Sequence, residues 1–83
     1  MKILKFSLPN CVPCKVLSKQ MEDLDLSNFE VQEVNLFNDT VLGFEYKIKN
    51  VPTLVILDGE KEVERVKNIT QLKEFLNYNK WKI

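Results

Sequence analysis

The 83-residue sequence contains no histidine and only two cysteines, Cys11 and Cys14. A closed tetrahedral zinc site needs four ligands, so one chain cannot complete it with cysteine and histidine alone. The longest apolar runs, such as residues 54–57, are far shorter than the roughly 20 residues of a membrane-spanning helix. Twelve basic and twelve acidic residues give a formal net charge of zero, which offers no electrostatic footprint for nucleic acid or an anionic membrane.

The length of the chain predicts one small domain. Eighty-three residues leave room for a single hydrophobic core, so we expect one domain over residues 1–83. The N-terminal segment lacks the long apolar stretch and small-residue cleavage site of a secretory signal. We therefore expect a cytoplasmic protein, and in that setting an isolated pair of nearby cysteines is more often catalytic than structural.

The two cysteines lie three positions apart in the stretch 10–15, Asn-Cys-Val-Pro-Cys-Lys, between an apolar run and a helical pattern. In the first turn of a helix, positions i and i+3 fall on one face, close enough for a disulfide to open and close. So small a loop removes little entropy from the unfolded chain, which argues against a purely stabilising crosslink. The spacing favours a redox-active pair over two core cysteines or half of a shared metal site.

Cys11 is the expected nucleophile of this pair. At the start of a helix its thiolate faces unpaired backbone N–H groups and the positive end of the helix dipole, which lower a thiol pKa from about 8.5 to roughly 3.5–7.5. Lys15 adds a nearby positive charge, and Pro13 suits a first turn because its missing N–H is not needed there. Cys14 lies one turn further in and is the expected resolving thiol, more buried and with the higher pKa.

Hydrophobic periodicity divides the chain into seven elements. The predicted strands cover residues 2–7, 29–36, 53–57 and the neighbourhood of 63–66, and the predicted helices cover 12 to about 24, 41 to about 47 and the neighbourhood of 69–76. Asp58-Gly59 is a hairpin signal between the last two strands. Asn38 or Asp39 can cap the second helix, which Gly43 weakens, and Asn68 or Thr70 can cap the third. Trp81 is expected to pack the C-terminus down.

The order β-α-β-α-β-β-α predicts the fold class. Two strands joined through a helix form a parallel pair with a right-handed crossover, and the terminal hairpin adds antiparallel strands. We therefore expect an α/β fold with a four-stranded mixed sheet flanked by three helices. The cysteine pair then lies at the carboxyl end of the first strand, where ligands and chemistry gather in open α/β sheets.

Several stretches of the sequence share the pattern of one family. They are Cys-Val-Pro-Cys-Lys at 11–15, Val-Pro-Thr at 51–53, Asp-Gly-Glu at 58–60 and the helical run 71–76. With them the chain resembles thioredoxins from end to end, and the combination of CxxC with a downstream Val-Pro-Thr is specific. The N-terminal strand and helix of full-length thioredoxins have no counterpart in this sequence. The chain is therefore similar to a minimal, glutaredoxin-sized thioredoxin.

The resemblance implies how a substrate is held. In thioredoxins the proline that matches Pro52 is cis and faces the cysteine pair, and the backbone beside it, here Val51, pairs with a substrate segment as an added strand. Lys67 stands where the family has a glycine and would add a positive rim to this groove. Asn10 stands where thioredoxins usually have tryptophan. The further residues expected to meet a substrate are Asn10, Val12 and Pro13.

Lys5 departs from the family pattern. Aligned without gaps, it occupies the position of a buried acid that assists proton transfer in thioredoxins. If Lys5 lies beneath the cysteine pair, its charge favours the thiolate and leaves proton transfer to water or another group. If the strand register differs, its ammonium group reaches solvent. Both locations are compatible with the sequence.

Together these features predict a thiol-disulfide oxidoreductase that reduces protein disulfides with its Cys11–Cys14 redox disulfide and no bound cofactor or metal. We expect a monomer that binds disulfide-containing proteins, without a nucleic acid or membrane partner. A donor of the thioredoxin-reductase type is favoured over glutathione, because Asp-Gly-Glu-Lys at 58–61 does not resemble a glutathione-binding corner. Three alternatives stay open: a glutaredoxin-like protein that uses glutathione, a non-catalytic binding module, and a dimer that holds a metal or cluster through two cysteine pairs.

Overall fold

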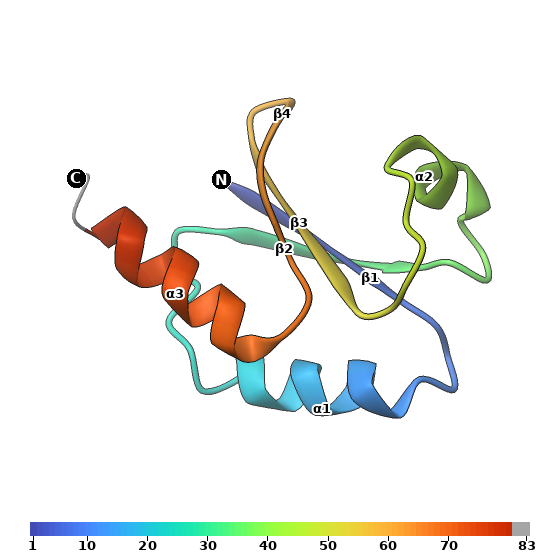
Figure 1. Cartoon of the computed structure of the whole chain (residues 1–83), viewed down its shortest axis with the longest axis horizontal. Coiled ribbons are helices and arrows are strands. Elements are labelled where there is room, and N and C mark those ends of the chain that lie inside the picture. The colour runs from blue at the N-terminus through green and yellow to red at the C-terminus, as the bar shows by residue number, and fades with distance from the viewer. Residues whose placement is uncertain (81–83) are drawn as a thin grey trace.

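The computed structural model describes the backbone of residues 1–80 and the side-chain environments of residues 1–77. Its elements are β1 (Lys2–Ser7), α1 (Val12–Met21), β2 (Glu30–Asn35), α2 (Thr40–Glu45), β3 (Thr53–Asp58), β4 (Lys61–Val66) and α3 (Ile69–Lys80) (Figure 1). Their order confirms the predicted β-α-β-α-β-β-α arrangement. Trp81 and its expected packing lie outside the described residues. No helix in the described part of the chain combines the length and apolar character needed to cross a membrane.

The four strands form one mixed sheet in the order β2-β1-β3-β4. β1 pairs in parallel with β2, and α1 is the crossover that joins them. β3 pairs antiparallel with both β1 and β4. The predicted fold class, a four-stranded mixed sheet with three helices, is thereby confirmed.

Alternate residues of the central strands serve two hydrophobic cores, because successive side chains of a strand point to opposite faces. On one face Ile3 of β1 packs with Leu17 of α1 and Leu72 of α3. On the other face Phe6 of β1 packs toward Tyr46, with ring centroids 5.7 Å apart. Each fully buried side chain of this size stabilises the fold by roughly 1.5–3 kcal/mol. Figure 1 shows α1 and α3 along one face of the sheet and α2 away from them.

The first helix is shorter than the sequence pattern predicts. It ends at Met21, and the prediction that it continues to about Leu24 is wrong. The N–H of Asp23 bonds to the carbonyl of Gln20 at 3.3 Å, and that of Leu24 bonds to the carbonyl of Met21 at 3.1 Å. These three-residue steps tighten and end the helix. Leu24 still packs against the hydrophobic core that contains Leu17. Its position therefore continues the apolar spacing of the helix, although the helix has ended.

Two side chains determine where α2 and α3 begin. Asp39 caps α2, because its Oδ1 accepts a hydrogen bond from the N–H of Leu42 at 3.3 Å. Asn68 caps α3, because its Oδ1 accepts from the N–H of Gln71 at 2.8 Å. Each bond satisfies a backbone donor that the first turn leaves without a helical partner.

Gly43 lets α2 pack closely on the segment that follows β2. A Cβ atom at this position would lie 2.6 Å from Cδ2 of Leu36, so any larger residue would force that side chain to move. The helix ends at Glu45 because Lys47 adopts a φ of 53°, which a right-handed helix cannot contain. The prediction that α2 continues to about Lys47 is therefore two residues too long.

Candidate active site at the cysteine pair

Three chain segments meet at one end of the sheet, next to the cysteines. Cys11 is the N-cap of α1 and follows β1 after a short turn. Phe6, near the end of β1, is in register with Thr53, the first residue of β3. Val66, the last residue of β4, is in register with Leu54. The end of β1, the start of β3 and the end of β4 therefore lie together at this end of the sheet.

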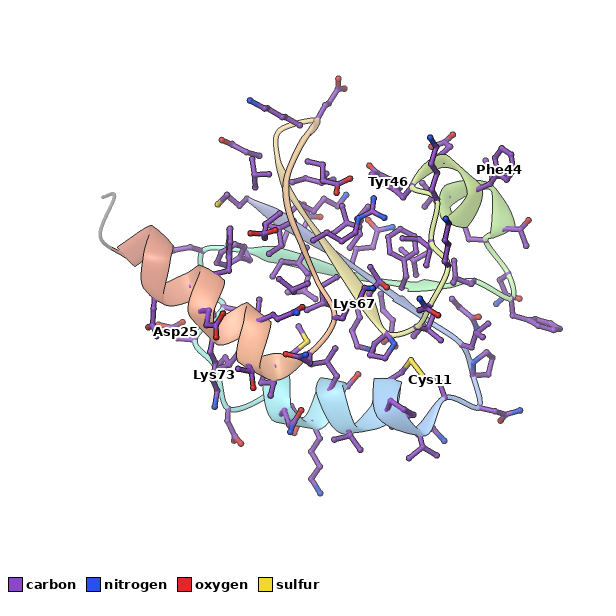
Figure 2. All side chains as sticks on the ribbon, viewed as in Figure 1. Cys11, Asp25, Phe44, Tyr46, Lys67 and Lys73 are labelled. Atoms are coloured by element: carbon purple, nitrogen blue, oxygen red, sulfur yellow. A yellow bond between two sulfur atoms is a disulfide. The ribbon has the colours of Figure 1, made fainter. Side chains whose placement is uncertain are left out.

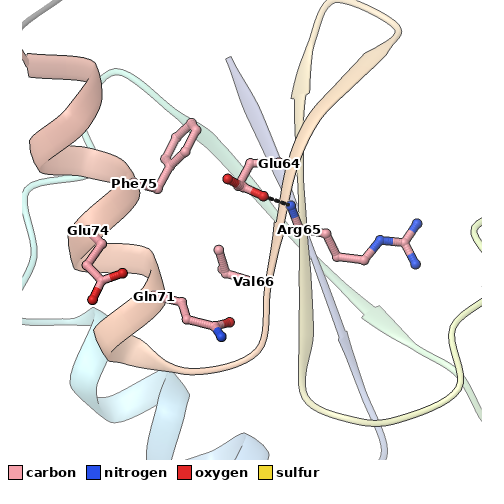
Figure 3. A pocket seen from close by; sticks show the side chains of 6 residues that line it. All are labelled: Glu64, Arg65, Val66, Gln71, Glu74 and Phe75. Carbon is pink, nitrogen blue, oxygen red and sulfur yellow. Dashed lines mark hydrogen bonds between the residues drawn. The ribbon is translucent and has the colours of Figure 1, made fainter.

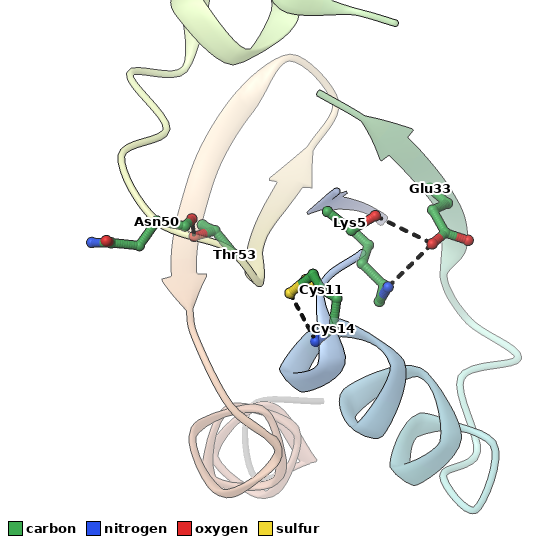
Figure 4. The surroundings of a disulfide bond; sticks show 7 residues. Lys5, Cys11, Cys14, Glu33, Asn50 and Thr53 are labelled. Atoms are coloured by element: carbon green, nitrogen blue, oxygen red, sulfur yellow. Dashed lines mark hydrogen bonds and ion pairs between the residues drawn. A yellow bond between two sulfur atoms is a disulfide. The ribbon is translucent and has the colours of Figure 1, made fainter. Parts of the chain in front are cut away.

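Cys11 and Cys14 form a disulfide with their Cα atoms 5.2 Å apart (Figure 4). The Sγ of Cys11 also accepts a hydrogen bond from the backbone N–H of Cys14 at 3.1 Å. After reduction, the same N–H is placed to stabilise a Cys11 thiolate. Cys11 is partly exposed, whereas Cys14 is only 2% exposed. The geometry thus separates an accessible sulfur from a buried one.

The surface beside Cys11 is formed by the residues next to it in the sequence. Asn10 and Pro13 are exposed, and Val12 is 68% exposed. Pro13 lies in the first turn of α1, where its missing N–H removes no helical hydrogen bond. Together they form an exposed surface next to the partly exposed Cys11.

The loop before β3 lies on the side of the disulfide where Cys11 is found, as Figure 4 shows for Asn50 and Thr53. Its Val51–Pro52 peptide bond is cis, and both residues are half-buried. The hydroxyl of Thr53 donates a hydrogen bond to the carbonyl of Asn50 at 2.6 Å. This bond ties the two ends of the loop together.

Lys5 lies beneath the start of α1. It is two residues after Ile3 on β1 and therefore points to the same face of the sheet, the face that α1 covers. Its side chain is only 4% exposed, and its Nζ lies 3.3 Å from Oε1 of Glu33 on β2. Ser7 donates a hydrogen bond to the same oxygen at 3.3 Å. Of the two locations that the sequence allowed, the structure shows the buried one.

A cavity of about 360 Å³, called here the cavity behind the disulfide, is lined by Cys14 and not by Cys11. Its polar lining consists of Lys5, Ser7, Lys15, Ser18, Glu33 and Asn35. Glu33 was not among the site residues predicted from the sequence. The signal that marks it is its register opposite Lys5 across β1 and β2, which depends on strand pairing and not on any local motif.

The remaining predicted site residues are exposed lysines. Lys15 lies on α1 beside Cys14 and contributes to the cavity lining. Lys67 follows β4 at the edge of the sheet that carries the cysteines, and its backbone N–H bonds to Oε1 of Gln71 at 2.8 Å. Its exposed side chain projects from a backbone that this bond fixes.

A second cavity, of about 430 Å³, lies between β4 and α3 (Figure 3). Its described lining residues are Glu64, Arg65, Val66, Gln71, Glu74 and Phe75, which include neither cysteine. Within residues 1–80, no group of three or more His, Cys, Asp or Glu side chains is arranged to hold a metal ion. Figure 2 shows that the sulfurs of the cysteine pair lie at the opposite end of the sheet from the β3–β4 turn.

Comparison with known proteins places the whole fold in one family. The family model described as thioredoxin matches residues 1–80. A thioredoxin of Chlamydia caviae is 30% identical over 66 residues, in an alignment that covers 77% of this chain and 65% of that protein. An SPbeta prophage-derived thioredoxin-like protein of Bacillus subtilis is 29% identical over 66 residues, with 78% and 79% covered. The chain thus spans about two thirds of the length of the first relative.

The solved structures agree with this assignment. The thioredoxin of Fasciola hepatica superposes with a TM-score of 0.84 and 25% identity, covering 93% of this chain and 78% of that one. A mutant thioredoxin of Halobacterium salinarum superposes with a TM-score of 0.79 and 25% identity, covering 93% and 72%. The region that the family model matches includes the cysteine pair and every strand of the sheet.

Proposed function

Because the chain belongs to the thioredoxin family, we propose that it reduces disulfide bonds in other proteins, with Cys11 as the nucleophile and Cys14 as the resolving thiol. The observation that carries this proposal is the asymmetry of the pair. Cys11 is partly exposed and accepts a backbone hydrogen bond at the start of α1, whereas Cys14 is buried one turn behind it. An accessible, stabilised thiolate beside a shielded thiol suits sequential thiol-disulfide exchange.

The proposed reaction has two exchange steps. The Cys11 thiolate attacks one sulfur of a substrate disulfide, so that a bond between Cys11 and the substrate forms, the substrate disulfide breaks, and the released substrate thiolate takes a proton from solvent. Cys14 then loses its proton and attacks Sγ of Cys11. The Cys11–Cys14 disulfide forms as the bond to the substrate breaks. Two electrons pass to the substrate, and a separate donor must return two electrons and two protons.

The substrate is proposed to bind as an extended segment beside the cysteines. The backbone of Val51, next to Pro52, would pair with it as an added strand, while its sulfur meets Cys11. The exposed side chains proposed to contact the substrate around that sulfur are those of Asn10, Val12, Pro13 and Lys67. Val12 offers an apolar contact, because it is 68% exposed.

Two lysines are proposed to favour the thiolate forms. A positive charge near a thiol stabilises the thiolate and lowers the thiol pKa. Lys5 is buried and lines the cavity with Cys14, so bulk solvent screens its charge less than that of an exposed lysine. Lys15 is exposed, and solvent screening makes its effect the smaller of the two.

For the cellular setting, we propose a cytoplasmic monomer that needs no bound cofactor and no membrane or nucleic acid partner. The electron donor is proposed to be of the thioredoxin-reductase type. Glutathione is the competing donor. To distinguish them, the protein is given either a thioredoxin reductase with NADPH or glutathione with its reductase and NADPH, and NADPH consumption is followed in each case. Turnover with the glutathione system and not with the thioredoxin reductase would favour the glutaredoxin-like alternative.

The test of the proposed function is insulin disulfide reduction with dithiothreitol as the electron source. The wild-type protein should accelerate the reaction, and Cys11→Ser should remove the acceleration. Equal rates for the wild type and Cys11→Ser would overturn the proposal and favour a binding module that does not use its cysteines.

A second measurement sets the direction of electron flow. The Cys11–Cys14 couple is equilibrated in thiol redox buffers, and free thiols are counted at each point. A reversible two-electron transition near or below roughly −230 mV supports a reductase, whereas a potential well above roughly −200 mV indicates an oxidant or isomerase. Absence of any reversible transition would favour the metal-binding or binding-module alternatives.

A further inference from the structure

We propose that Glu33 is the proton acceptor for Cys14, acting through the cavity behind the disulfide, and that Lys5 and Ser7 hold it in place. The inference rests on the proposed function, because it names the group that serves the second exchange step. It also assigns a role to a residue that no sequence motif marks.

The Glu33 carboxylate contacts two residues of β1 and is also exposed to solvent. It lies opposite Lys5 in the register of β1 and β2. Its Oε1 lies 3.3 Å from both Nζ of Lys5 and Oγ of Ser7 (Figure 4). Yet its side chain is 66% exposed, against 4% for Lys5. The carboxylate therefore reaches from the cavity to solvent and can exchange protons with both.

Cys14 needs such a group because bulk water has poor access to it. The residue is 2% exposed, and its thiol must lose a proton before it can attack Cys11. The cavity of about 360 Å³ that it lines has room for several waters, each of which occupies about 30 Å³ in the liquid. Water in this space can connect the thiol to the carboxylate.

Three charged side chains face the cavity among the described residues: Lys5 from β1, Lys15 from α1 and Glu33 from β2. An ammonium group carries only donors, whereas an ionised carboxylate accepts hydrogen bonds and protons. Ser7, Ser18 and Asn35 complete the polar lining and can order water, but they are far weaker bases. Glu33 is therefore the group in this cavity suited to take the proton.

Proton transfer from Cys14 precedes its attack on Cys11. The proton of the Cys14 thiol passes through cavity water to Glu33, and the Cys14 thiolate attacks Sγ of Cys11. The Cys11–Cys14 bond forms, the bond between Cys11 and the substrate breaks, and the substrate thiolate leaves and is protonated by solvent. Glu33 then returns its proton to solvent through its exposed side. Two electrons pass to the substrate, as in the proposed function.

A purely electrostatic role for Glu33 predicts the opposite result from a proton-transfer role. Glu33→Gln removes a negative charge and leaves the Lys5 ammonium unpaired beside Cys14, which favours the thiolate and should speed resolution near neutral pH. If Glu33 accepts the proton, the same substitution should slow resolution. The glutamine keeps an oxygen that can accept from Lys5 and Ser7, so the packing is preserved.

The experiment mixes reduced protein with 5,5′-dithiobis(2-nitrobenzoate) in a stopped-flow spectrometer. The first thionitrobenzoate released reports the attack by Cys11, and the second reports the attack of Cys14 on Cys11. Near neutral pH, Glu33→Gln should slow the second release about tenfold and leave the first unchanged. This is less than the ~10²–10⁴ of many general bases, because water also enters the cavity. Above about pH 9, where a thiol ionises unaided, the two proteins should converge.

Two controls separate chemistry from structure. Glu30→Gln changes an exposed glutamate on the same strand that does not line the cavity, and it should leave both releases unchanged. Glu33→Ala opens space at the carboxylate, and added acetate should speed its second release in proportion to the acetate concentration, whereas the wild type should not respond. If Glu33→Ala does not fold, Glu33→Asp takes its place and should retain part of the rate that Glu33→Gln loses.

An unchanged or faster second release in Glu33→Gln would overturn the role of Glu33. So would a slowing that is equal at every pH, or a folded Glu33→Ala that ignores acetate. In each of these results the wild type still releases both groups, so the proposed function stands. A wild-type protein that releases only one thionitrobenzoate would instead contradict the proposed function itself.

Discussion

The two faces of α1 differ sharply in their surroundings. On the inner face, Cys14, Leu17 and Met21 are buried against the sheet at helical spacing. On the outer face, which continues from Cys11, Val12 and Val16 are 68% and 50% exposed. One turn of helix therefore places one cysteine at the partly exposed start of α1 and the other, buried, against the cavity behind the disulfide. Two chemically identical side chains therefore lie in different surroundings, as different roles in the proposed reaction require.

The charges around the two sulfurs differ as well. The inner sulfur shares its cavity with Lys5 and Glu33, which pair across β1 and β2. The outer sulfur is stabilised by a backbone N–H at the start of the helix. The paired charged side chains therefore lie beside Cys14, whereas Cys11 contacts a backbone donor.

Replacing each cysteine in turn gives the largest expected difference between the faces. Cys11→Ser should lower insulin reduction about a thousandfold or more, because it removes the nucleophile. Cys14→Ser should still attack but should stop at the mixed disulfide, visible as a covalent complex on a non-reducing gel. Covalent complexes of equal abundance in both variants would mean that the two sulfurs are interchangeable.

The stability of the fold should depend on the inner face. Leu17→Ala should lower the free energy of unfolding by about 2–5 kcal/mol, because it leaves a cavity between α1 and the sheet. Val16→Ala, one residue away on the outer face, should cost less than about 0.5 kcal/mol. Denaturant unfolding followed by circular dichroism measures both, and similar losses would erase the distinction between the faces.

Removing the buried lysine should act on the inner sulfur. Lys5→Met takes a positive charge away from the cavity, which destabilises the thiolate, so the pKa of the Cys14 thiol should rise. Lys15→Met should raise it less, because solvent screens that exposed charge. The thiolate absorbance of each variant in a Cys11→Ser background, followed against pH, gives both values. A larger rise with Lys15→Met than with Lys5→Met would mean that the exposed lysine, and not the buried one, has the greater effect on the pKa of the Cys14 thiol.

The smallest effect is expected on the outer face. Val12→Ser should slow insulin reduction only a few-fold, because about one exposed methyl contact to the substrate is lost. The reaction of Cys11 with 5,5′-dithiobis(2-nitrobenzoate) should not change. The matched control is Val41→Ser on α2, at a valine of similar exposure, which should leave both reactions unaltered. An equal slowing in the control would show that Val12 does not meet the substrate.

The sequence predicts the fold well where burial is local and periodic. Ile3, Phe6 and Leu54 lie in strands whose apolar runs mark the centre of the sheet, and Leu17 and Met21 mark the inner face of α1. The prediction from the sequence fails at the end of α1. Leu24 packs on the same core from a turn, so the apolar pattern continues where the helix does not.

The site is predictable only as far as one segment determines it. The cysteine pair and its place at the start of α1 follow from residues 10–15. Glu33 does not, because its place beside Lys5 depends on the register of β1 against β2, and a shift of one residue would turn it to the other face. The choice between Asn38 and Asp39 as a cap likewise depends on backbone geometry that composition does not determine.

The difference between the two sulfurs is tested most directly by their rates of alkylation. Fully reduced protein is treated with limiting iodoacetamide near neutral pH, digested, and analysed by mass spectrometry to locate the modified cysteine. An exposed thiolate at the start of a helix should react about tenfold faster or more than a buried thiol, so Cys11 should carry nearly all of the label. Equal labelling, or preferential labelling of Cys14, would contradict the division of roles between the two faces of α1.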